Sequence, residues 1–323
     1  MTPLLVLVIP IYNEQEVLEE LQRRLRAALD AIPELEWRVL YVDDGSELPT
    51  REVLRRQHQE DARFGVLRLS RNFGHEAAIT AGLDHADGDV VVVLDGDLQD
   101  PPEMIPRLIA AWRDGGQVVF AVRHSRADGG WRGLGFRLFH SLFRLLSDFP
   151  VAARTGAFIL LDRVALEAVR AMPERNRYLP GLHTWVGFDQ RFLTYDREAR
   201  AAGDPKQSFR RLLALAFDAL FSFSYKPLRL MTWSGLGISL AGFLFGLHFV
   251  VKRLTGIETA QTGFTTLVTL VLFLGGLQLL GFGLIGEYLG RVYDEVKRRP
   301  LYLVRERLGV ERKEAGGNRD GRG

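Results

Sequence analysis

The sequence predicts an α/β fold with a Rossmann-like, doubly wound sheet, followed by an interfacial helix and two transmembrane helices. Apolar runs typical of buried strands alternate with stretches of helical spacing in the first part of the chain, which is the pattern of a doubly wound sheet. Three of these runs end in polar turns. Two uncharged stretches, residues 230–251 and 259–286, come later, and each is long enough to cross a hydrocarbon core of about 30 Å.

The strands of the expected sheet are five short apolar runs: Leu4–Ile9, Val39–Val42, Val66–Leu69, Val90–Leu94 and Val118–Val122. Helices are expected between them, because parallel strands are joined by right-handed crossovers. The carboxyl ends of parallel strands meet at one edge of the sheet, and ligands of open α/β sheets bind in the crevice beyond that edge.

Short polar residues mark where several helices are expected to begin. Asn13 is expected to cap the first helix, and Asp100 to cap a helix that ends near Arg113, since Asp and Asn are favoured at that position. A further strand, Phe158–Leu161, is expected to lead into a helix that Asp162 caps.

The run Val90–Leu94 ends in two carboxylates, Asp95 and Asp97, with only Gly96 between them. Two carboxylates so close repel each other unless a cation lies between them, and Mg²⁺ takes one or two carboxylates together with substrate phosphates. Gly96 lacks the side chain that would keep a bulky anion away from the backbone. An acidic turn after a strand is also common without any ligand, so this pattern alone leaves both interpretations open.

Composition excludes several classes of protein. A formal net charge of +2 over 323 residues argues against a dedicated nucleic-acid binder, although the sequence pI of about 8.9 is basic. The absence of cysteine excludes disulfides and thiolate zinc sites and fits a cytosolic environment. We expect Leu4–Ile9 to be the first strand rather than a signal peptide, because it is short and follows no basic residue.

The motifs together resemble the family 2 glycosyltransferases of the GT-A fold, and more narrowly the polyprenyl-phosphate glycosyltransferases, which include bactoprenol glucosyltransferases and dolichol-phosphate mannose synthase. The resemblance covers nearly the whole chain. It is carried by residues 10–14, 42–46, 69–74, 95–97, 98–103, 286–291 and 297–300.

The resemblance implies transfer of a hexose, with glucose as the best guess, from a nucleoside-diphosphate sugar to a polyprenyl phosphate. It implies Mg²⁺ or Mn²⁺ held by Asp95 and Asp97, with Arg123 as a third catalytic residue. The substrate-binding residues that it implies around the base, ribose and phosphates are Pro10, Tyr12, Glu14, Val42, Asp43, Asp44, Gly96, Gln99, Arg126, Arg200 and Lys206. The base could be uracil, as in UDP-glucose, with GDP-mannose or a modified aminopentose donor as alternatives.

The second half of the chain carries the membrane pattern. Residues 208–225 are expected to form an amphipathic helix in the interface, followed by the two spans. Basic residues gather before the first span and after the second, whereas the loop between them holds only Lys252, Arg253 and Glu258. The positive-inside rule therefore places the catalytic domain in the cytoplasm, as part of a multi-pass protein of the inner cell membrane.

Four domains follow from these patterns: a cytoplasmic glycosyltransferase domain (1–207), a juxtamembrane helix (208–229), a two-helix transmembrane hairpin (230–289) and a basic cytoplasmic tail with a disordered end (290–323). Five glycines from Gly275 to Gly286 permit close helix packing, so a homo-oligomer is expected. Neither a processive polysaccharide synthase nor a transporter fits well, because two short spans form no channel and carry no charge inside.

One stretch departs from the family pattern. Where the family usually reads Gly-Asp-Phe-Arg, this chain reads Gly156-Ala157-Phe158-Ile159. The carboxylate often assigned to the acceptor site is therefore missing, together with the nearby arginine. A phosphate acceptor is mostly ionised at pH 7 and needs no general base. The alternative is a weak or inactive paralogue that binds a nucleotide-sugar or lipid phosphate as a membrane partner.

Overall fold

A computed structural model of the protein describes residues 2–123, 155–175, 177–196, 226–255 and 263–310. The chain divides into two compact units. The first, which we call the sheet domain, holds the N-terminal part of the chain and residues 299–323. The second holds residues 209–298, with two long helices that we call the hairpin.

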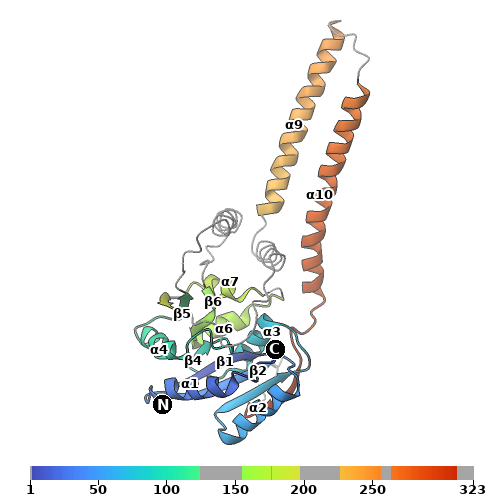
Figure 1. Ribbon diagram of the computed structural model, residues 1–323. Coiled ribbons are helices and arrows are strands. Elements are labelled where there is room, and N and C mark those ends of the chain that lie inside the picture. The colour runs from blue at the N-terminus through green and yellow to red at the C-terminus, as the bar shows by residue number, and fades with distance from the viewer. Residues whose placement is uncertain (1, 124–154, 176, 197–225, 256–262, 311–323) are drawn as a thin grey trace, which may run out of the picture. The chain divides into compact units, whose positions relative to one another are not determined.

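The sheet domain is built on one sheet of eight strands in the order β7-β5-β6-β4-β1-β2-β3-β8 (Figure 1). Helices alternate with the first strands along the chain, as the sequence predicts. The elements are β1 (Leu4–Ile11), α1 (Leu18–Asp30), β2 (Glu36–Asp43), α2 (Leu48–Glu60), β3 (Phe64–Leu69), α3 (His75–His85), β4 (Val90–Val93), η1 (Pro102–Met104), α4 (Ile105–Arg113), β5 (Val118–Arg123), β6 (Thr155–Asp162), α6 (Arg163–Ala171), α7 (Leu179–Trp185), β7 (Gln190–Tyr195) and β8 (Val304–Leu308).

The central strands β3, β2, β1 and β4 are parallel, which confirms the predicted doubly wound α/β class. Val90–Val93 of β4 are completely buried, as expected for a strand covered on both faces. The sequence did not predict that β6 inserts between β4 and β5 and runs antiparallel to both. Strand β7 then pairs with β5 in parallel. The carboxyl ends of β1, β2, β4, β5 and β7 therefore share one edge with the start of β6.

Helices cover both faces of the sheet. The apolar sides of α1 and α4 pack on one face, where Leu21, Leu25 and Leu108 join the core cluster. Helices α3, α6 and α7 pack against strands from the other face. Both faces are apolar because each central strand is buried on both sides. A sheet held in this way is a rigid frame for the loops at its edge.

The strand β8 follows the hairpin in sequence and returns to the sheet domain. It pairs antiparallel with β3, and the backbone N–H of Ser70 donates to the carbonyl of Leu303 at 2.8 Å. Glu306 of β8 accepts hydrogen bonds from Arg55 of α2 at 2.8 and 2.9 Å. The sequence predicted only a basic tail here, because five residues with alternating charge carry little strand signal.

Two of the three predicted helix caps were wrong. Asp162 caps α6, since its carboxylate accepts from the Ala165 N–H at 2.7 Å. Asn13 caps no helix; it has a φ of 56°, and its side chain accepts from the Glu47 N–H at 2.8 Å. Asp100 is completely buried, and the helix that follows begins without a side-chain cap. Both residues serve the edge of the sheet instead.

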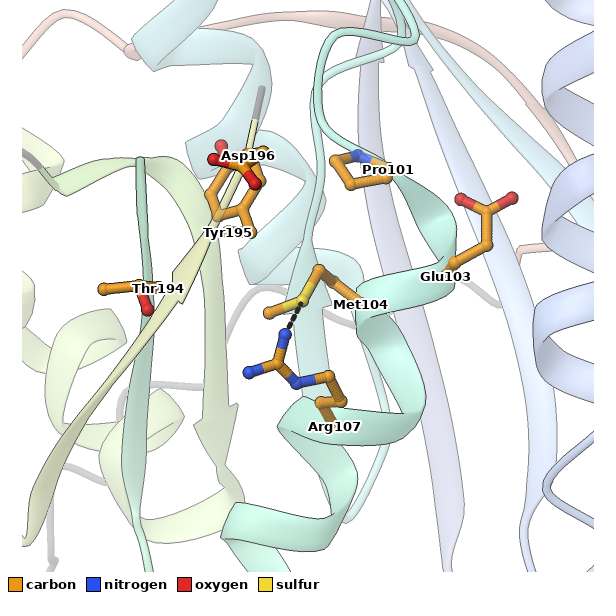
Figure 2. A pocket seen from close by; sticks show the side chains of 7 residues that line it. All are labelled: Pro101, Glu103, Met104, Arg107, Thr194, Tyr195 and Asp196. Atoms are coloured by element: carbon orange, nitrogen blue, oxygen red, sulfur yellow. Dashed lines mark hydrogen bonds between the residues drawn. The ribbon is translucent and has the colours of Figure 1, made fainter. Parts of the chain in front are cut away.

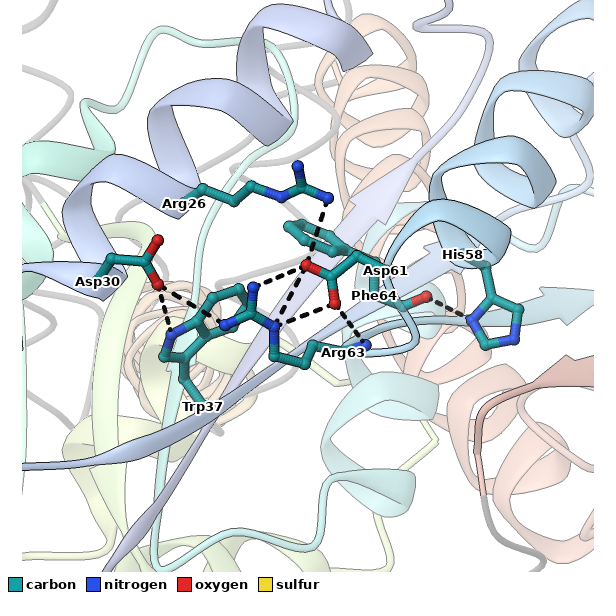
Figure 3. Close-up of polar contacts among 7 residues, drawn as sticks. All are labelled: Arg26, Asp30, Trp37, His58, Asp61, Arg63 and Phe64. Carbon is teal, nitrogen blue, oxygen red and sulfur yellow. Dashed lines mark hydrogen bonds and ion pairs between the residues drawn. The ribbon is translucent and has the colours of Figure 1, made fainter. Parts of the chain in front are cut away.

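The opposite, amino-terminal edge is fastened by a polar cluster between α1, α2, β2 and β3 (Figure 3). The Arg63 guanidinium lies over the Trp37 ring, 3.7 Å from its centroid, and donates to Asp61 at 2.8 Å. The hydrogen bond from Arg63 is the main reason why the pKa of Asp61 lies below its usual value. Trp37 in turn donates to Asp30 at 3.3 Å. These contacts hold the frame at the end away from the site.

The hairpin consists of α9 (Lys226–Leu254) and α10 (Phe264–Val296). Large apolar side chains project outward from both helices, such as Trp233 and Phe282, each 69% exposed. Within the described residues, Phe273–Val296 is long and apolar enough to cross a membrane, and Met231–Phe245 is a shorter apolar stretch. So much exposed apolar surface is unfavourable in water, which indicates membrane association.

Close packing between the two helices involves one of the predicted glycines. A Cβ added at Gly281 would lie 2.8 Å from Met231 Cε of α9, so this glycine permits the helices to approach. Gly275, Gly276, Gly283 and Gly286 face open space. Their part in an oligomer stays a prediction.

Several predictions fall outside the described residues. These are the interfacial helix at residues 208–225 and the disordered end of the basic tail. The expected phosphate-binding residues Arg126, Arg200 and Lys206 also lie there.

Candidate active site

The carboxyl edge of the sheet brings together several of the residues that the sequence singled out. Pro10 is the second-last residue of β1, Asp43 and Arg123 are the last residues of β2 and β5, and Asp95 lies two residues after β4. They come from strands far apart in the sequence but side by side in the sheet. This is the position where ligands bind to open α/β sheets.

Asp95 lies at the centre of this edge. Its side chain is 20% exposed, and its Oδ1 is buried with no hydrogen-bond donor. The nearest basic groups are the Nε2 of His75, at 3.4 Å from Oδ1, and the Nη2 of Arg123, at 4.0 Å from Oδ2. A buried carboxylate oxygen that makes no hydrogen bond is costly, and a cation bound at Asp95 would relieve that cost.

Negative charge is crowded around Asp95. Burial raises the pKa of Asp95, and repulsion from Asp100 and Asp97 raises it further, while His75 and Arg123 lower it. Two like charges 4 Å apart repel by about 4 kcal/mol at an effective dielectric constant of about 20. The site therefore favours any additional positive charge.

The turn after β4 fixes the second carboxylate. Asp97 accepts a hydrogen bond from the backbone N–H of Gln99 at 3.1 Å, which closes a tight turn. Leu98 in that turn has a φ of 59° although its side chain is buried. A branched residue rarely adopts this conformation, so surrounding contacts must hold the turn in place. Gln99 is buried next to it.

Gly96 has a packing role. A Cβ at this position would lie 2.5 Å from Ile11 Cδ1 and 3.2 Å from the carbonyl oxygen of Pro10. The turn therefore lies tightly on the end of β1. This close approach to β1 is enough to explain why position 96 is a glycine. The sequence had suggested a different reason, namely room for a bulky anion.

Asp44 holds a neighbouring loop. Its two carboxylate oxygens accept from the backbone N–H groups of Phe73 and Gly74, at 2.7 and 2.9 Å. Burial raises the pKa of Asp44, although these two hydrogen bonds oppose the shift. Gly45 follows with a φ of 76°, and a Cβ there would lie 2.4 Å from the backbone of Arg71. The turn after β2 is thus packed directly against the loop before α3.

Asp43 is committed to the frame of this turn. Its Oδ1 accepts from the Ser46 N–H at 2.8 Å, and its Oδ2 lies 3.3 Å from Nε of Arg68. Arg68 also lies 3.8 Å from Glu306 of β8. Asp43 is 1% exposed, so it supports the site from beneath.

The other expected donor residues line the same edge with different exposure. Pro10 and Val42 are buried within their strands. Tyr12 is 50% exposed at the end of β1, and Glu14 is half-buried two residues later. An exposed aromatic ring beside the turn after β2 is a suitable surface for a planar ligand.

A buried polar network lies beside Asp95, and the sequence analysis missed it. Tyr195, at the end of β7, donates a short hydrogen bond to Asp100. Arg123 donates to the Tyr195 hydroxyl at 3.2 Å and to Asp100 at 3.5 Å. Gly156 leaves room for this guanidinium, since a Cβ there would lie 3.1 Å from Arg123 Nη2. Asp100 carried a signal, as it follows the acidic motif directly, but Tyr195 carried none.

A shallow pocket of about 390 Å³ opens next to this network (Figure 2). Tyr195 and Asp196 form one wall, and Pro101 and Met104 form another. Arg107 closes the floor, where it contacts the Met104 sulfur at 3.2 Å. Tyr195 thus belongs both to the network and to the lining of this pocket.

The strand β6 carries the departure from the family pattern. Ala157 is half-buried near the edge, and Ile159 is completely buried opposite Val93 and Phe120. Position 159 is a core position in this chain. Position 157 offers no carboxylate to the edge.

The residues present fit a divalent cation. Asp95 offers a buried carboxylate oxygen that makes no hydrogen bond, and Asp97 lies two residues away in a fixed turn. Among the described residues, no group of three or more His, Asp or Glu side chains forms a site able to hold a metal alone. Two carboxylates, such as those of Asp95 and Asp97, are the donor set of Mg²⁺ or Mn²⁺ sites that complete their shell with water and substrate phosphates.

Comparison with known proteins identifies the family of the chain. A model of glycosyl transferase family 2 matches residues 6–170. A model of the GtrB C-terminal hairpin matches residues 226–292. The chain belongs to glycosyl transferase family 2. It is therefore a glycosyltransferase with a GT-A-like sheet and a C-terminal helical hairpin, as the sequence predicted.

Relatives match over nearly the full length. An uncharacterized glycosyltransferase of Synechocystis sp. is 41% identical, over 96% of this chain and 98% of the relative. A prophage bactoprenol glucosyl transferase homolog of Escherichia coli (strain K12) is 36% identical, over 93% of this chain and 97% of the relative. The bactoprenol glucosyl transferase of Shigella phage SfII has the same identity and the same shares.

Two solved structures resemble the chain more loosely. A mannosyltransferase from Pyrobaculum calidifontis, in complex with GDP-Man and Mn²⁺, covers 93% of this chain and 89% of its own, with a TM-score of 0.47 and 15% identity. A glucosyl-3-phosphoglycerate synthase from Mycobacterium tuberculosis covers 68% of this chain and 78% of its own, with a TM-score of 0.49 and 16% identity.

Replacing Asp44 with asparagine tests the link between the two loops. The variant turns one acceptor oxygen into a donor facing a backbone N–H. Loss of a hydrogen bond to a charged group costs about 1.5–3 kcal/mol, so the amides of Phe73 and Gly74 should exchange with deuterium roughly ten- to a hundredfold faster. Mass spectrometry of a peptide covering the loop measures this. Asp61→Asn, at the opposite edge, is the matched control, and equal exchange in both variants would contradict the assignment.

Proposed function

We propose that the protein transfers a hexose, with glucose as the first candidate, from UDP-glucose or a related nucleoside-diphosphate sugar to a polyprenyl phosphate. The reaction depends on Mg²⁺ or Mn²⁺ and takes place at the cytoplasmic face of the cell membrane. The observation that carries the proposal is the buried Asp95 oxygen that makes no hydrogen bond, with Asp97 two residues away, at the carboxyl edge of the sheet. The bactoprenol glucosyl transferases among the relatives support the lipid acceptor.

Asp95 and Asp97 would hold the divalent cation. When bound, the cation would neutralise the charge that builds up on the leaving diphosphate. Arg123 lies 4.0 Å from Asp95 and presents a guanidinium to the same side. Arginine binds phosphate oxygens through two parallel hydrogen bonds. Arg123 would therefore orient the diphosphate, while the cation held by the two carboxylates would neutralise its charge.

The donor base and ribose would lie over the ends of β1 and β2. Tyr12 offers an exposed ring there, and the loop that Asp44 pins forms the neighbouring wall. Pro10 and Val42 shape the floor from within their strands. Asp43 keeps the turn after β2 in place from beneath.

The acceptor needs no general base from β6. A phosphate monoester has its second pKa near 6, so its oxygen is mostly ionised at pH 7. Ala157 in place of a carboxylate therefore does not prevent attack on the sugar. Arg126, Arg200 and Lys206 remain proposed partners of the phosphates.

The return of β8 to the sheet supports an even number of membrane crossings. β3 lies before the hairpin in sequence and β8 lies after it, yet the two strands pair. A segment that begins and ends on the same side of a membrane crosses it an even number of times. With two helices in the hairpin, this favours two spans and a sheet domain on the cytoplasmic, positively flanked side.

Nucleic acid is not a proposed partner. The expected homo-oligomer finds no support in the structure's described residues or in the relatives, and it is not part of the proposal.

Membranes that contain the protein should transfer labelled glucose from UDP-glucose to undecaprenyl phosphate when Mg²⁺ or Mn²⁺ is present. Chelation should abolish the lipid-bound label. Asp97→Ala should lower it at least a hundredfold, because the cation loses half of its protein ligands. Organic extraction and scintillation counting measure the product. Asp114→Asn, an exposed carboxylate of the same domain, should leave transfer unchanged. Absence of transfer with a full panel of UDP- and GDP-sugars, despite nucleotide binding, would overturn the proposal.

Restoring the carboxylate on β6 tests the alternative of a weak or inactive paralogue. If the acceptor phosphate needs no base, Ala157→Asp should leave the transfer rate within about twofold or lower it, since a new negative charge repels the acceptor phosphate. The initial rate at saturating donor measures this. A rise of tenfold or more would show that the wild-type chain lacks a group that limits catalysis.

A further inference from the structure

The network of Asp100, Tyr195 and Arg123 is larger than Arg123 needs to bind a diphosphate. Asp100 is completely buried, and a buried carboxylate without partners is strongly unfavourable. Its partners are the Tyr195 hydroxyl and the Arg123 guanidinium. We propose that Asp100 and Tyr195 are positioning residues that hold Arg123 away from Asp95 and so keep Asp95 available to a divalent cation. This inference rests on the proposed function.

Arg123 has two carboxylates within reach. Its Nη2 lies 3.5 Å from Asp100 Oδ2 and 4.0 Å from Asp95 Oδ2. It donates to Asp100, but at 4.0 Å it makes no hydrogen bond to Asp95. The guanidinium is thus committed to Asp100 while it remains a near neighbour of Asp95.

Tyr195 stabilises the pairing of Arg123 with Asp100. Its hydroxyl donates to Asp100 Oδ1 and accepts from Arg123 Nε, so it joins the two groups into one closed arrangement. The Tyr195 ring is held by Phe158, whose ring lies edge-on at 5.8 Å. Gly156 leaves the space that the guanidinium occupies. Each contact keeps Arg123 on the Asp100 side.

Without Asp100, Arg123 would pair with a different carboxylate. Asp95 would become the nearest carboxylate to Arg123, and a bidentate arginine–carboxylate pair would form where the cation should bind. The cation would then have to displace a bound guanidinium. Asp100→Asn should therefore weaken cation binding because it releases Arg123 to pair with Asp95. This effect should be larger than the effect of removing one negative charge at a distance from the cation.

A double-mutant cycle separates these two effects. The probe is Mn²⁺ in the presence of UDP, with the full-length protein in detergent, and electron paramagnetic resonance of free Mn²⁺ gives the dissociation constant. We expect Asp100→Asn to weaken Mn²⁺ binding by roughly tenfold. In the background of Arg123→Gln, the same change should have less than a twofold effect. Tyr195→Phe should act in the same direction as Asp100→Asn, but more weakly.

Asp114→Asn is the matched control, because Asp114 also pairs with an arginine, Arg191, but in an exposed position. It should leave Mn²⁺ binding unchanged. Thermal unfolding of each variant checks that it is folded, and Tyr195→Phe tests the inference if Asp100→Asn does not fold.

Equal weakening by Asp100→Asn with and without Arg123 would overturn the inference, since Asp100 would then act directly as a charge near the cation. No weakening in either background would also overturn it. Failure of the wild-type protein to bind Mn²⁺ with UDP would instead remove the proposed metal site itself, so the two failures are distinguishable.

Discussion

The crowding of carboxylates after β4 is the constraint on which the rest of the site depends. Asp95, Asp97 and Asp100 lie within six residues, and Asp100 is completely buried. Their mutual repulsion is opposed by Arg123 near Asp95 Oδ2 and by His75 near Asp95 Oδ1, yet Oδ1 makes no hydrogen bond. In the proposed function, a divalent cation that arrives with the donor diphosphate would offset this negative charge. The sheet contributes by fixing the positions of the charges, because the strands beneath them are packed on both faces.

The frame is closed by a segment that lies far away in the sequence. Strand β8 follows the hairpin, pairs with β3 and brings Glu306 within 3.8 Å of Arg68, which contacts Asp43 beneath the turn after β2. The part of the chain after the membrane hairpin therefore supports the same edge as the part before it. This connection accounts for a catalytic domain whose sequence is interrupted by the apolar helices, and it ties the topology of the hairpin to the integrity of the sheet.

Much of this could be predicted from sequence, for identifiable reasons. The apolar run of β4 and the turns after β1, β2 and β4 have strong local signals, and parallel strands bring such turns to one edge. The insertion of β6 between β4 and β5 depends on contacts between distant residues, which no local pattern encodes. Asp100 was predicted as a helix cap because Asp before two prolines is a typical helix start; its burial depends on Tyr195, about a hundred residues away. Asn13 was misassigned for the same reason, since its partner Glu47 lies in another loop.

The central claim is that the carboxylates after β4 hold a divalent cation that binds the donor diphosphate. A crystal or cryo-EM structure of the full-length protein with Mn²⁺ and UDP tests it most directly, and anomalous scattering from crystals identifies the metal. The account predicts one Mn²⁺ peak within coordination distance of both Asp95 and Asp97 and of the UDP phosphates, with Arg123 still bound to Asp100. A Mn²⁺ peak elsewhere, or UDP bound with Asp95 paired to Arg123 and no metal, would contradict it.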